Sequence, residues 1–318
     1  MRPIIIFIIL AISPLFLFSQ QYTDIDKKAR STPFSKDHLR LAHELTEEYQ
    51  DEVSKTRAIF TWLAHHISYD NSRRENFKKT GKRTKTKFVA KSEAGLEQQK
   101  QKMIQDNINQ TLANKKGVCQ DYAWVFQAML EEIGIECAFV SGFGRFSPNN
   151  IGKIHKKGNH AWNAVKINSK WELMDVTWST GMGAIQNFGD GFFMVPPEIF
   201  LLSHYPDEDR WQLMEQPIDK ETFSKQPFMH AGFMSSNIRS ITPSTGKVSR
   251  KDVFTIEVAL KENQSIAIFK ARKISKNEMT RTGDKYSIDL SKTRLLGNVD
   301  FVIIEKGQVT PLITIKVR

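Results

Sequence analysis

Residues 119–142 constrain the fold of this chain more than any other stretch. Between residues 119 and 133, apolar side chains recur at the spacing of one helix face. Gly134 follows this run, as a glycine that ends a helix does. The next residues, IECAFVSG (135–142), form a short apolar run typical of a buried strand. A helix that leads directly into a buried strand predicts a domain that mixes α and β structure.

A β-hairpin is predicted further along the chain. Residues 160–167 and 171–178 alternate in the manner of two strands, and Asn168-Ser169 between them is a turn signal. With a two-residue turn, His160 faces Thr177 on the second strand. A three-residue turn would change which residues share a face.

Two helices are predicted before this region, within residues 35–68. Ser35 is a candidate cap for the first helix, and Asp51 or Ser54 for the second. Residues 71–98 lack apolar periodicity and are predicted to be a solvated insertion, after which the glutamine-rich stretch 96–112 could be helical.

Positive charge is concentrated in residues 71–116. The whole chain has a formal net charge of +11, and this basic segment contains 13 lysines and arginines against four acids, a net charge of +9. Such a segment is most often a solvated loop, and the alternative is contact with an anionic surface. Only Phe77 and Phe88 interleave aromatic rings with these charges, so no nucleic-acid partner is expected.

A second unit, residues 227–318, is predicted to be a small all-β domain. Its β-prone runs are short and separated by turn residues; they are 252–260, 265–271, 285–290, 299–304 and 312–317. Strands at this spacing predict a β-sandwich, which could be immunoglobulin-like. The unit offers no nucleophile–base pair, so packing or binding is its expected role.

The first twenty residues differ from the rest of the chain. Arg2 precedes an almost wholly apolar run from Ile4 to Phe18, and Ser19 restores polarity. The run is shorter than the about 20 apolar residues that a membrane span needs. Residues 1–20 are therefore predicted to be a signal peptide, with an uncleaved anchor as the alternative. The protein is then expected to be exported, periplasmic or secreted, with its main domain at residues 21–226.

The two cysteines, Cys119 and Cys137, are expected to play different roles rather than to form a disulfide. Cys137 lies inside the predicted strand and is most simply a small core residue. Cys119 begins the predicted helix, just after Gly117 and Val118. Unpaired N–H groups and the helix dipole stabilise a thiolate at such a position and make it a better nucleophile. The alternative for Cys119 is an ordinary core thiol.

His160 and Asp175 could supply the base that such a nucleophile needs. In the hairpin with a two-residue turn, Asp175 lies diagonal to His160 on the same face, within reach of its side chain. A carboxylate there can accept the imidazole N–H, fix the tautomer and stabilise the imidazolium. Together with Cys119 this is an arrangement for acyl transfer. The alternatives are a strand-edge polar histidine and a solvated acid near a turn.

Four stretches of the chain carry a family resemblance. RAIFTWLAHHISYD, KKGVCQDYAWVFQAMLEEIGI and GNHAWNAVKINSKWELMDVTWS resemble the transglutaminase-like superfamily and occur in its order. FFMVPPEIFLLSHYPDEDRWQL resembles a subgroup related to eukaryotic cytokinesis and muscle proteins. The resemblance covers about residues 35–225. It implies an α+β fold, in which a transglutaminase-like (papain-like) domain is followed by the β domain.

The resemblance also implies roles for individual residues. Cys119 would be the nucleophile, His160 the general base and then the general acid, and Asp175 the residue that orients His160. The oxyanion would be held by the Cys119 backbone N–H and one further donor. Gln110, the nearest upstream glutamine, does not have the spacing of the papain-like oxyanion glutamine and is not assigned.

Three more residues are candidates for the wall of the site. Classical transglutaminases follow the cysteine with tryptophan, whereas this chain has Gln120, a departure that argues against protein cross-linking. Trp162 and Trp178 could wall the site and exclude water, and the alternative for both is a place in the core.

We therefore expect a cysteine enzyme that forms a thioester at Cys119 with a protein, peptide or cell-wall peptide substrate. Water or an amine then accepts the acyl group, and hydrolysis is favoured because water is the default acceptor. The alternative is a non-catalytic interaction or scaffold protein with the same fold. No cofactor is expected, and no metal, because the sequence offers no spaced set of His, Cys and Asp ligands.

Overall fold

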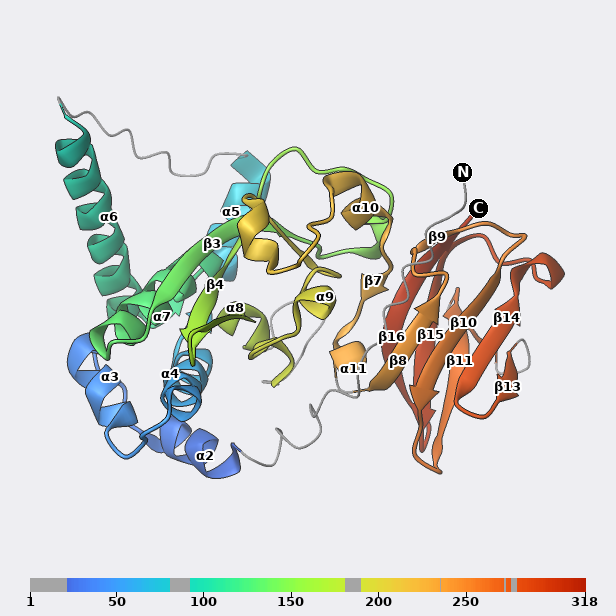
Figure 1. The fold of residues 1–318 in the computed structure, drawn as a ribbon, viewed down its shortest axis with the longest axis horizontal. Helices are drawn as coiled ribbons and strands as arrows, with labels where there is room; N and C mark the ends of the chain where they lie inside the picture. The colour runs from blue at the N-terminus through green and yellow to red at the C-terminus, as the bar shows by residue number, and fades with distance from the viewer. Residues whose placement is uncertain (1–21, 81–91, 181–189, 235, 272, 276–278) are drawn as a thin grey trace.

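The computed structural model describes residues 22–80, 92–180 and 190–318, except residues 235, 272 and 276–278. The predicted signal peptide lies outside these residues. Figure 1 shows a part that mixes helices and strands, coloured blue to yellow, and an all-β part, coloured orange to red. This is the predicted α+β class. No helix in the described ranges combines the length and the apolar character that crossing a membrane requires.

Between residue 22 and the basic segment lie three helices: α2 (Thr23–Ser31), α3 (His38–Thr46) and α4 (Glu52–His66). Asp51 caps α4 as predicted, because its side chain accepts a hydrogen bond from the Ser54 N–H at 2.7 Å. The prediction of Ser35 as the cap of α3 is wrong. That helix begins at His38, and Asp37 accepts the Arg40 N–H at 3.1 Å.

The basic segment is more helical than its pattern predicts. Residues Asn71–Thr80 form α5, and Glu93–Asn114 form α6. The prediction of a loop over residues 71–98 is wrong for residues 71–80 and 93–98, whereas residues 81–91 lie outside the described residues. Helix is confirmed for residues 96–112. Asp70 accepts the Arg73 N–H at 3.1 Å at the start of α5. Helix α5 has only one apolar residue, Phe77, and one residue gives no apolar stripe, which is why periodicity missed this helix.

The nucleophile candidate lies on α7 (Cys119–Glu132), which leads into β3 (Cys137–Gly144). Gly134 has a φ of +78° and ends the helix, as predicted. The central sheet has the order β5-β4-β3-β6, in which β3 pairs antiparallel with both β4 (His160–Ile167) and β6 (His204–Pro206).

The predicted hairpin is right in its turn and register but wrong in the length of its second strand. Asn168 and Ser169 have φ values of +49° and +67°, as a two-residue type I′ turn requires. Strand β5 (Lys170–Met174) then ends before the predicted residue 178. Residues Val176–Ser179 form helix α8 instead. Thr177 therefore does not pair with His160 across the two strands. Asp175 follows β5 and caps α8.

The C-terminal part consists of two sheets. One has the order β13-β14-β10-β8, and the other contains β12-β11-β15-β16-β7, with β9 paired to β16. The strands are β7 (Phe228–Met229), β8 (Asn237–Thr242), β9 (Lys247–Val248), β10 (Val253–Ala259), β11 (Gln264–Lys270), β12 (Lys273–Ser275), β13 (Thr280–Thr282), β14 (Lys285–Asp289), β15 (Gly297–Glu305) and β16 (Gln308–Val317). All five predicted strands are present. Buried residues of both sheets, such as Phe254 and Phe301, share one apolar cluster.

Short elements join these parts. They are β1 (Ser68–Tyr69), β2 (Lys116–Gly117), η1 (Pro148–Asn150), η2 (Asp190–Phe192), α9 (Pro197–Phe200), η3 (Asp209–Gln212), α10 (Lys220–Lys225), α11 (Ala231–Met234) and η4 (Leu290–Lys292).

Two apolar clusters bracket the central sheet. One fills the space between the sheet and the N-terminal helices and includes Phe126 and Val165. The other includes Trp162 and Phe200 and continues into the C-terminal sheets through Met229 and Ile313. Because both clusters are extensive, the sheet holds the residues at the start of β4 in a rigid setting.

Candidate active site

Cys119 is the first residue of α7 and is half-buried, with a free thiol. The turn before it is closed by two reciprocal hydrogen bonds. The Asp121 carboxylate accepts the Val118 N–H at 2.8 Å, and the Val118 carbonyl accepts the Asp121 N–H at 2.9 Å. These two hydrogen bonds fix the peptide immediately before the sulfur.

His160 begins β4, where the sheet holds its backbone against β3. Its Nε2 lies 2.6 Å from Asp175 Oδ2, and both side chains are 1% exposed. Cys119 acts on the same imidazole, because its charge raises the His160 pKa. Since Nε2 is engaged with Asp175, Nδ1 is the nitrogen left for the sulfur. The three residues predicted to act together are thus brought together.

Asp175 is held on several sides. Its N–H donates to the Phe192 carbonyl at 2.9 Å, and its Oδ1 accepts the Trp178 N–H at 3.0 Å as the cap of α8. Its other carboxylate oxygen, Oδ2, is therefore left to accept hydrogen bonds from imidazole N–H groups. A helix cap directs the carboxylate, because the capping bond fixes the side-chain rotamer.

His204, which sequence reasoning left in an aromatic tail, belongs to the same cluster. Its Nε2 lies 3.0 Å from Asp175 Oδ2, and Ser203 Oγ lies 2.7 Å from its Nδ1. His204 is fully buried and stacks on Phe200, with 4.1 Å between ring centroids. The available signal was a lone histidine inside the apolar run FLLSHYP, since a histidine buried there needs a polar partner.

The two histidines have opposite pKa shifts. Burial disfavours the charged form of His160, but the charges of Asp175 and Cys119 and their hydrogen bonds outweigh it and raise its pKa to about 10. Burial lowers the pKa of His204 to about 4, because the hydrogen bond and charge of Asp175 compensate only in part. For Asp175, burial acts to raise the pKa, but the two imidazoles hold it well below its usual range.

Aromatic rings enclose His160. Phe146 lies edge-on to it with 5.5 Å between centroids, and Trp178 and Trp162 lie at 5.6 and 5.9 Å. Both tryptophans are buried in the core cluster, so they pack as core residues that also border the site. Their indole N–H groups have no hydrogen-bond partner among the described residues. Gln120 is half-buried, next to Cys119 on α7.

His160, Asp175 and His204 are also a group whose ligand atoms lie within 4.8 Å of one another. No sequence pattern indicated this set, because its members come from three separate segments. Both Nε2 atoms are already hydrogen-bonded to one carboxylate oxygen, so the atoms that would bind a cation satisfy one another.

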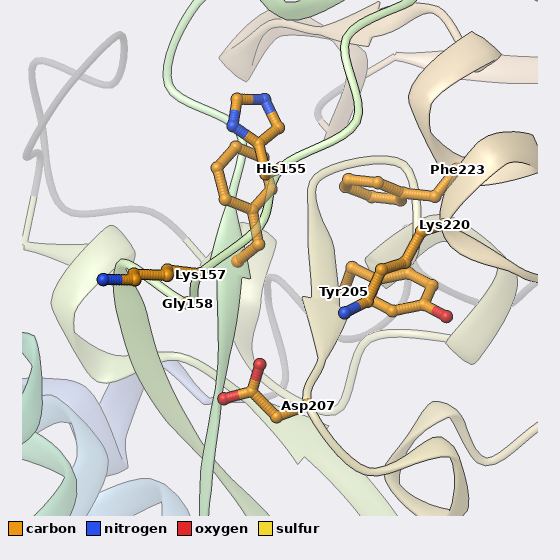
Figure 2. Close-up of a pocket in the computed structure, with 8 residues that line it drawn as sticks. His155, Lys157, Gly158, Tyr205, Asp207, Lys220 and Phe223 are labelled. Atoms are coloured by element: carbon orange, nitrogen blue, oxygen red, sulfur yellow. The ribbon is translucent and has the colours of Figure 1, made fainter.

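A separate pocket lies beside residues 155–158, just before β4 begins (Figure 2). Its volume is about 310 Å³, the open mouth included. Aromatic residues form its walls, with His155 stacked on Phe143 at 3.6 Å between centroids and Tyr205 and Phe223 opposite. Lys157, Lys220 and Asp207 surround it, and neither Cys119, His160 nor Asp175 lines it.

Cys137 lies apart from this site. It is buried and free, and burial raises the pKa of its thiol well above the usual value. Asn163 donates a hydrogen bond to its sulfur at 3.4 Å. The prediction that it is a core residue without a disulfide is confirmed.

The fold is that of a transglutaminase-like (papain-like) domain, in which the helix that begins at Cys119 packs on the sheet that carries His160. Residues 39–176 match the model of the transglutaminase-like superfamily.

Curated relatives support the same class. Kyphoscoliosis peptidase of Mus musculus is 26% identical over 246 residues, which is 74% of this chain and 34% of that protein. Cytokinesis protein 3 of Saccharomyces cerevisiae is 21% identical over 198 residues, 59% of this chain and 22% of that protein. The chain thus spans about a third of the length of the first of these relatives. A solved structure described as a putative cysteine protease from Cytophaga hutchinsonii has a TM-score of 0.28, with 18% identity, and covers 49% of this chain and 42% of that one.

Proposed function

We propose that this protein is an exported cysteine enzyme that cleaves amide bonds through a thioester at Cys119. The observation that carries the proposal is the buried His160–Asp175 pair, with 2.6 Å between Nε2 and Oδ2, whose imidazole pKa is raised by the charges of Asp175 and Cys119. A thiolate–imidazolium pair oriented by an acid is an activated nucleophile with its proton donor in place.

In the first half of the reaction, the Cys119 thiolate attacks the carbonyl carbon of the amide. The oxyanion that forms is stabilised by the Cys119 backbone N–H, at the start of α7, and one further donor. The C–N bond then breaks, and His160 transfers its proton to the departing amine. The products are a thioester on Cys119 and a free amine, or ammonia from a carboxamide.

In the second half, neutral His160 takes a proton from water, and the resulting hydroxyl group attacks the thioester. The C–S bond breaks, which releases a carboxylic acid and restores the thiolate–imidazolium pair. An amine in place of water would give a new amide. We propose hydrolysis as the main outcome, because Gln120 stands where classical transglutaminases have tryptophan.

The expected substrate is a protein, peptide or cell-wall peptide outside the cytoplasm. The apolar run from Ile4 to Phe18 supports export as a signal peptide. The basic segment, residues 71–116, is proposed to contact an anionic surface there. Mass spectrometry of the mature protein tests export, since cleavage near Ser19 or Gln20 predicts the loss of about twenty residues.

Activity is tested by incubating the protein with a casein-like acceptor and an amine donor. Ammonia release without amine incorporation is expected, and it should disappear in Cys119→Ala. Incorporation would instead indicate a transferase. If neither reaction occurs across peptide and cell-wall substrates, the scaffold alternative holds and the proposed activity is wrong.

A further inference from the structure

We propose that Arg73, on the first helix of the basic segment, is a positioning residue for Cys119 and acts through the Asp121 carboxylate. The inference deepens the proposed function, because it concerns how the nucleophile of that reaction is held. It also gives part of the basic segment a role inside the molecule.

Asp121 holds the turn that presents Cys119. Its Oδ2 accepts the Val118 N–H at 2.8 Å, one peptide before the cysteine. The side chain is 1% exposed, and its Oδ1 has no hydrogen-bond partner among the described residues. A buried carboxylate with a spare lone pair is costly unless a cation compensates it.

Arg73 supplies that cation. Its Nη1 lies 2.6 Å from Asp121 Oδ2, the same oxygen that accepts the Val118 N–H. Burial raises the pKa of Asp121, whereas the Val118 N–H and Arg73 lower it. Without Arg73, the carboxyl would bind a proton more readily, and a protonated carboxyl is a weaker acceptor for the Val118 N–H.

The path from α5 to the nucleophile is short and fixed. Strand β1 pairs in parallel with β2, so that Tyr69 is the partner of Gly117. The Asp70 N–H then donates to the Gly117 carbonyl at 2.8 Å, directly before α5 begins. A Cβ on Gly117 would lie 2.9 Å from the Asp121 Cβ, so glycine leaves room for the Asp121 side chain. Arg73 is thereby placed over the start of α7.

The charges also favour this role. An unpaired Asp121 anion two residues from Cys119 would repel a thiolate and oppose the positive end of the helix. Arg73 neutralises that anion, so the capping hydrogen bond is kept without the repulsion. The Asp121 carboxylate thus keeps its alignment of the backbone, while Arg73 cancels its unfavourable charge.

The test is the rate at which iodoacetamide alkylates Cys119 in the full chain at neutral pH, with Cys119→Ala as the blank. Arg73→Gln should slow alkylation roughly fivefold or more, the equivalent of losing about one capping interaction. Arg73→Lys should restore the rate to within about twofold, since a lysine can supply the same point charge. Lys79→Gln, an exposed neighbour on α5 with the same change of charge, should leave the rate unchanged.

Asp121→Asn shows whether Arg73 acts through the carboxylate. An amide oxygen can still accept the Val118 N–H but needs no cation, so Arg73→Gln should have little further effect in the Asp121→Asn background. The proposal is overturned if Arg73→Gln alkylates as fast as Lys79→Gln, or if its effect persists undiminished in the Asp121→Asn protein. If the variants differ in alkylation rate in this way but the wild-type protein cleaves no amide, the proposed function is contradicted and the positioning role of Arg73 is supported.

Discussion

His204 and His160 point their Nε2 atoms at one oxygen of Asp175, and the His204 contact is 3.0 Å long. Three buried titratable groups thus share one negative charge. If both imidazoles were protonated, one buried cation would lack a counter-charge. The pKa values differ, about 10 for His160 and about 4 for His204, because the single Asp175 carboxylate can neutralise only one imidazolium. His204 therefore supports the acid as a neutral hydrogen-bond donor.

A first prediction concerns stability in acid. Unfolded His204 takes up a proton below about pH 6.5, but in the folded protein it does so only near pH 4. The unfolded state binds more protons in this window, so the free energy of unfolding should fall as the pH drops from 6.5 to 4, by on the order of 2 kcal/mol from this group. In His204→Asn that contribution should vanish, as measured by urea unfolding at several pH values.

His155→Asn is the matched control for this prediction. His155 is half-buried beside the separate pocket and stacked on Phe143, and burial lowers its pKa. Its replacement should leave most of the acid slope in place. A slope that is equal in wild type and His204→Asn would show that His204 is not the buried neutral group.

A second prediction concerns Asp175. Asp175→Asn removes the charge that keeps His160 protonated, so burial should then lower the His160 pKa by more than one unit from about 10. Ring-proton NMR titration of His160 measures this directly. Turnover should fall by roughly 10²- to 10⁴-fold, because the asparagine no longer stabilises the imidazolium.

The same variant predicts a change in alkaline stability. A raised pKa for His160 stabilises the folded state fully below about pH 6.5, and this stabilisation is lost as the pH rises through about 10. Wild type should therefore lose stability between these values, and Asp175→Asn should lose much less. An unchanged His160 titration in the variant would contradict the proposed ion pair.

A third prediction concerns Arg145, which is buried at the end of β3. Its guanidinium donates to the carbonyls of Gln226 at 2.8 Å, Pro227 at 3.1 Å and Phe223. Arg145→Ala leaves these carbonyls without their donor, so the free energy of unfolding should fall by on the order of 3 kcal/mol. Arg210→Ala, at an exposed ion pair with Glu208, should change it by less than about 1 kcal/mol. Urea unfolding compares the two, and equal losses would contradict the structural role of Arg145.

The sequence predicted the parts of the fold that depend on apolar periodicity and turn chemistry. Helix α7, the type I′ turn at Asn168-Ser169 and five strands of the C-terminal part were found in this way. It also selected the three residues that meet in the site. The end of β5 was missed because the Asp175 carboxylate caps α8, a local hydrogen bond that strand alternation does not reveal.

Two other features could not be read from local patterns. Helix α5 has a single apolar residue, Phe77, so no apolar stripe distinguishes it from a loop. His204 reaches Asp175 only because β6 pairs with β3 far along the chain, and such pairing is decided by tertiary structure. Both features lie beside the candidate triad. Helix α5 contacts the start of α7 near Cys119, and His204 contacts Asp175.

The most direct measurement for the central proposal compares iodoacetamide alkylation of Cys119 in wild type and in His160→Ala at pH 6 and pH 8. If the imidazolium of His160 holds the sulfur as a thiolate, wild type should react at similar rates at both values, and His160→Ala should be at least about tenfold slower at pH 6. Equal rates for the two proteins at pH 6 would contradict the ion pair.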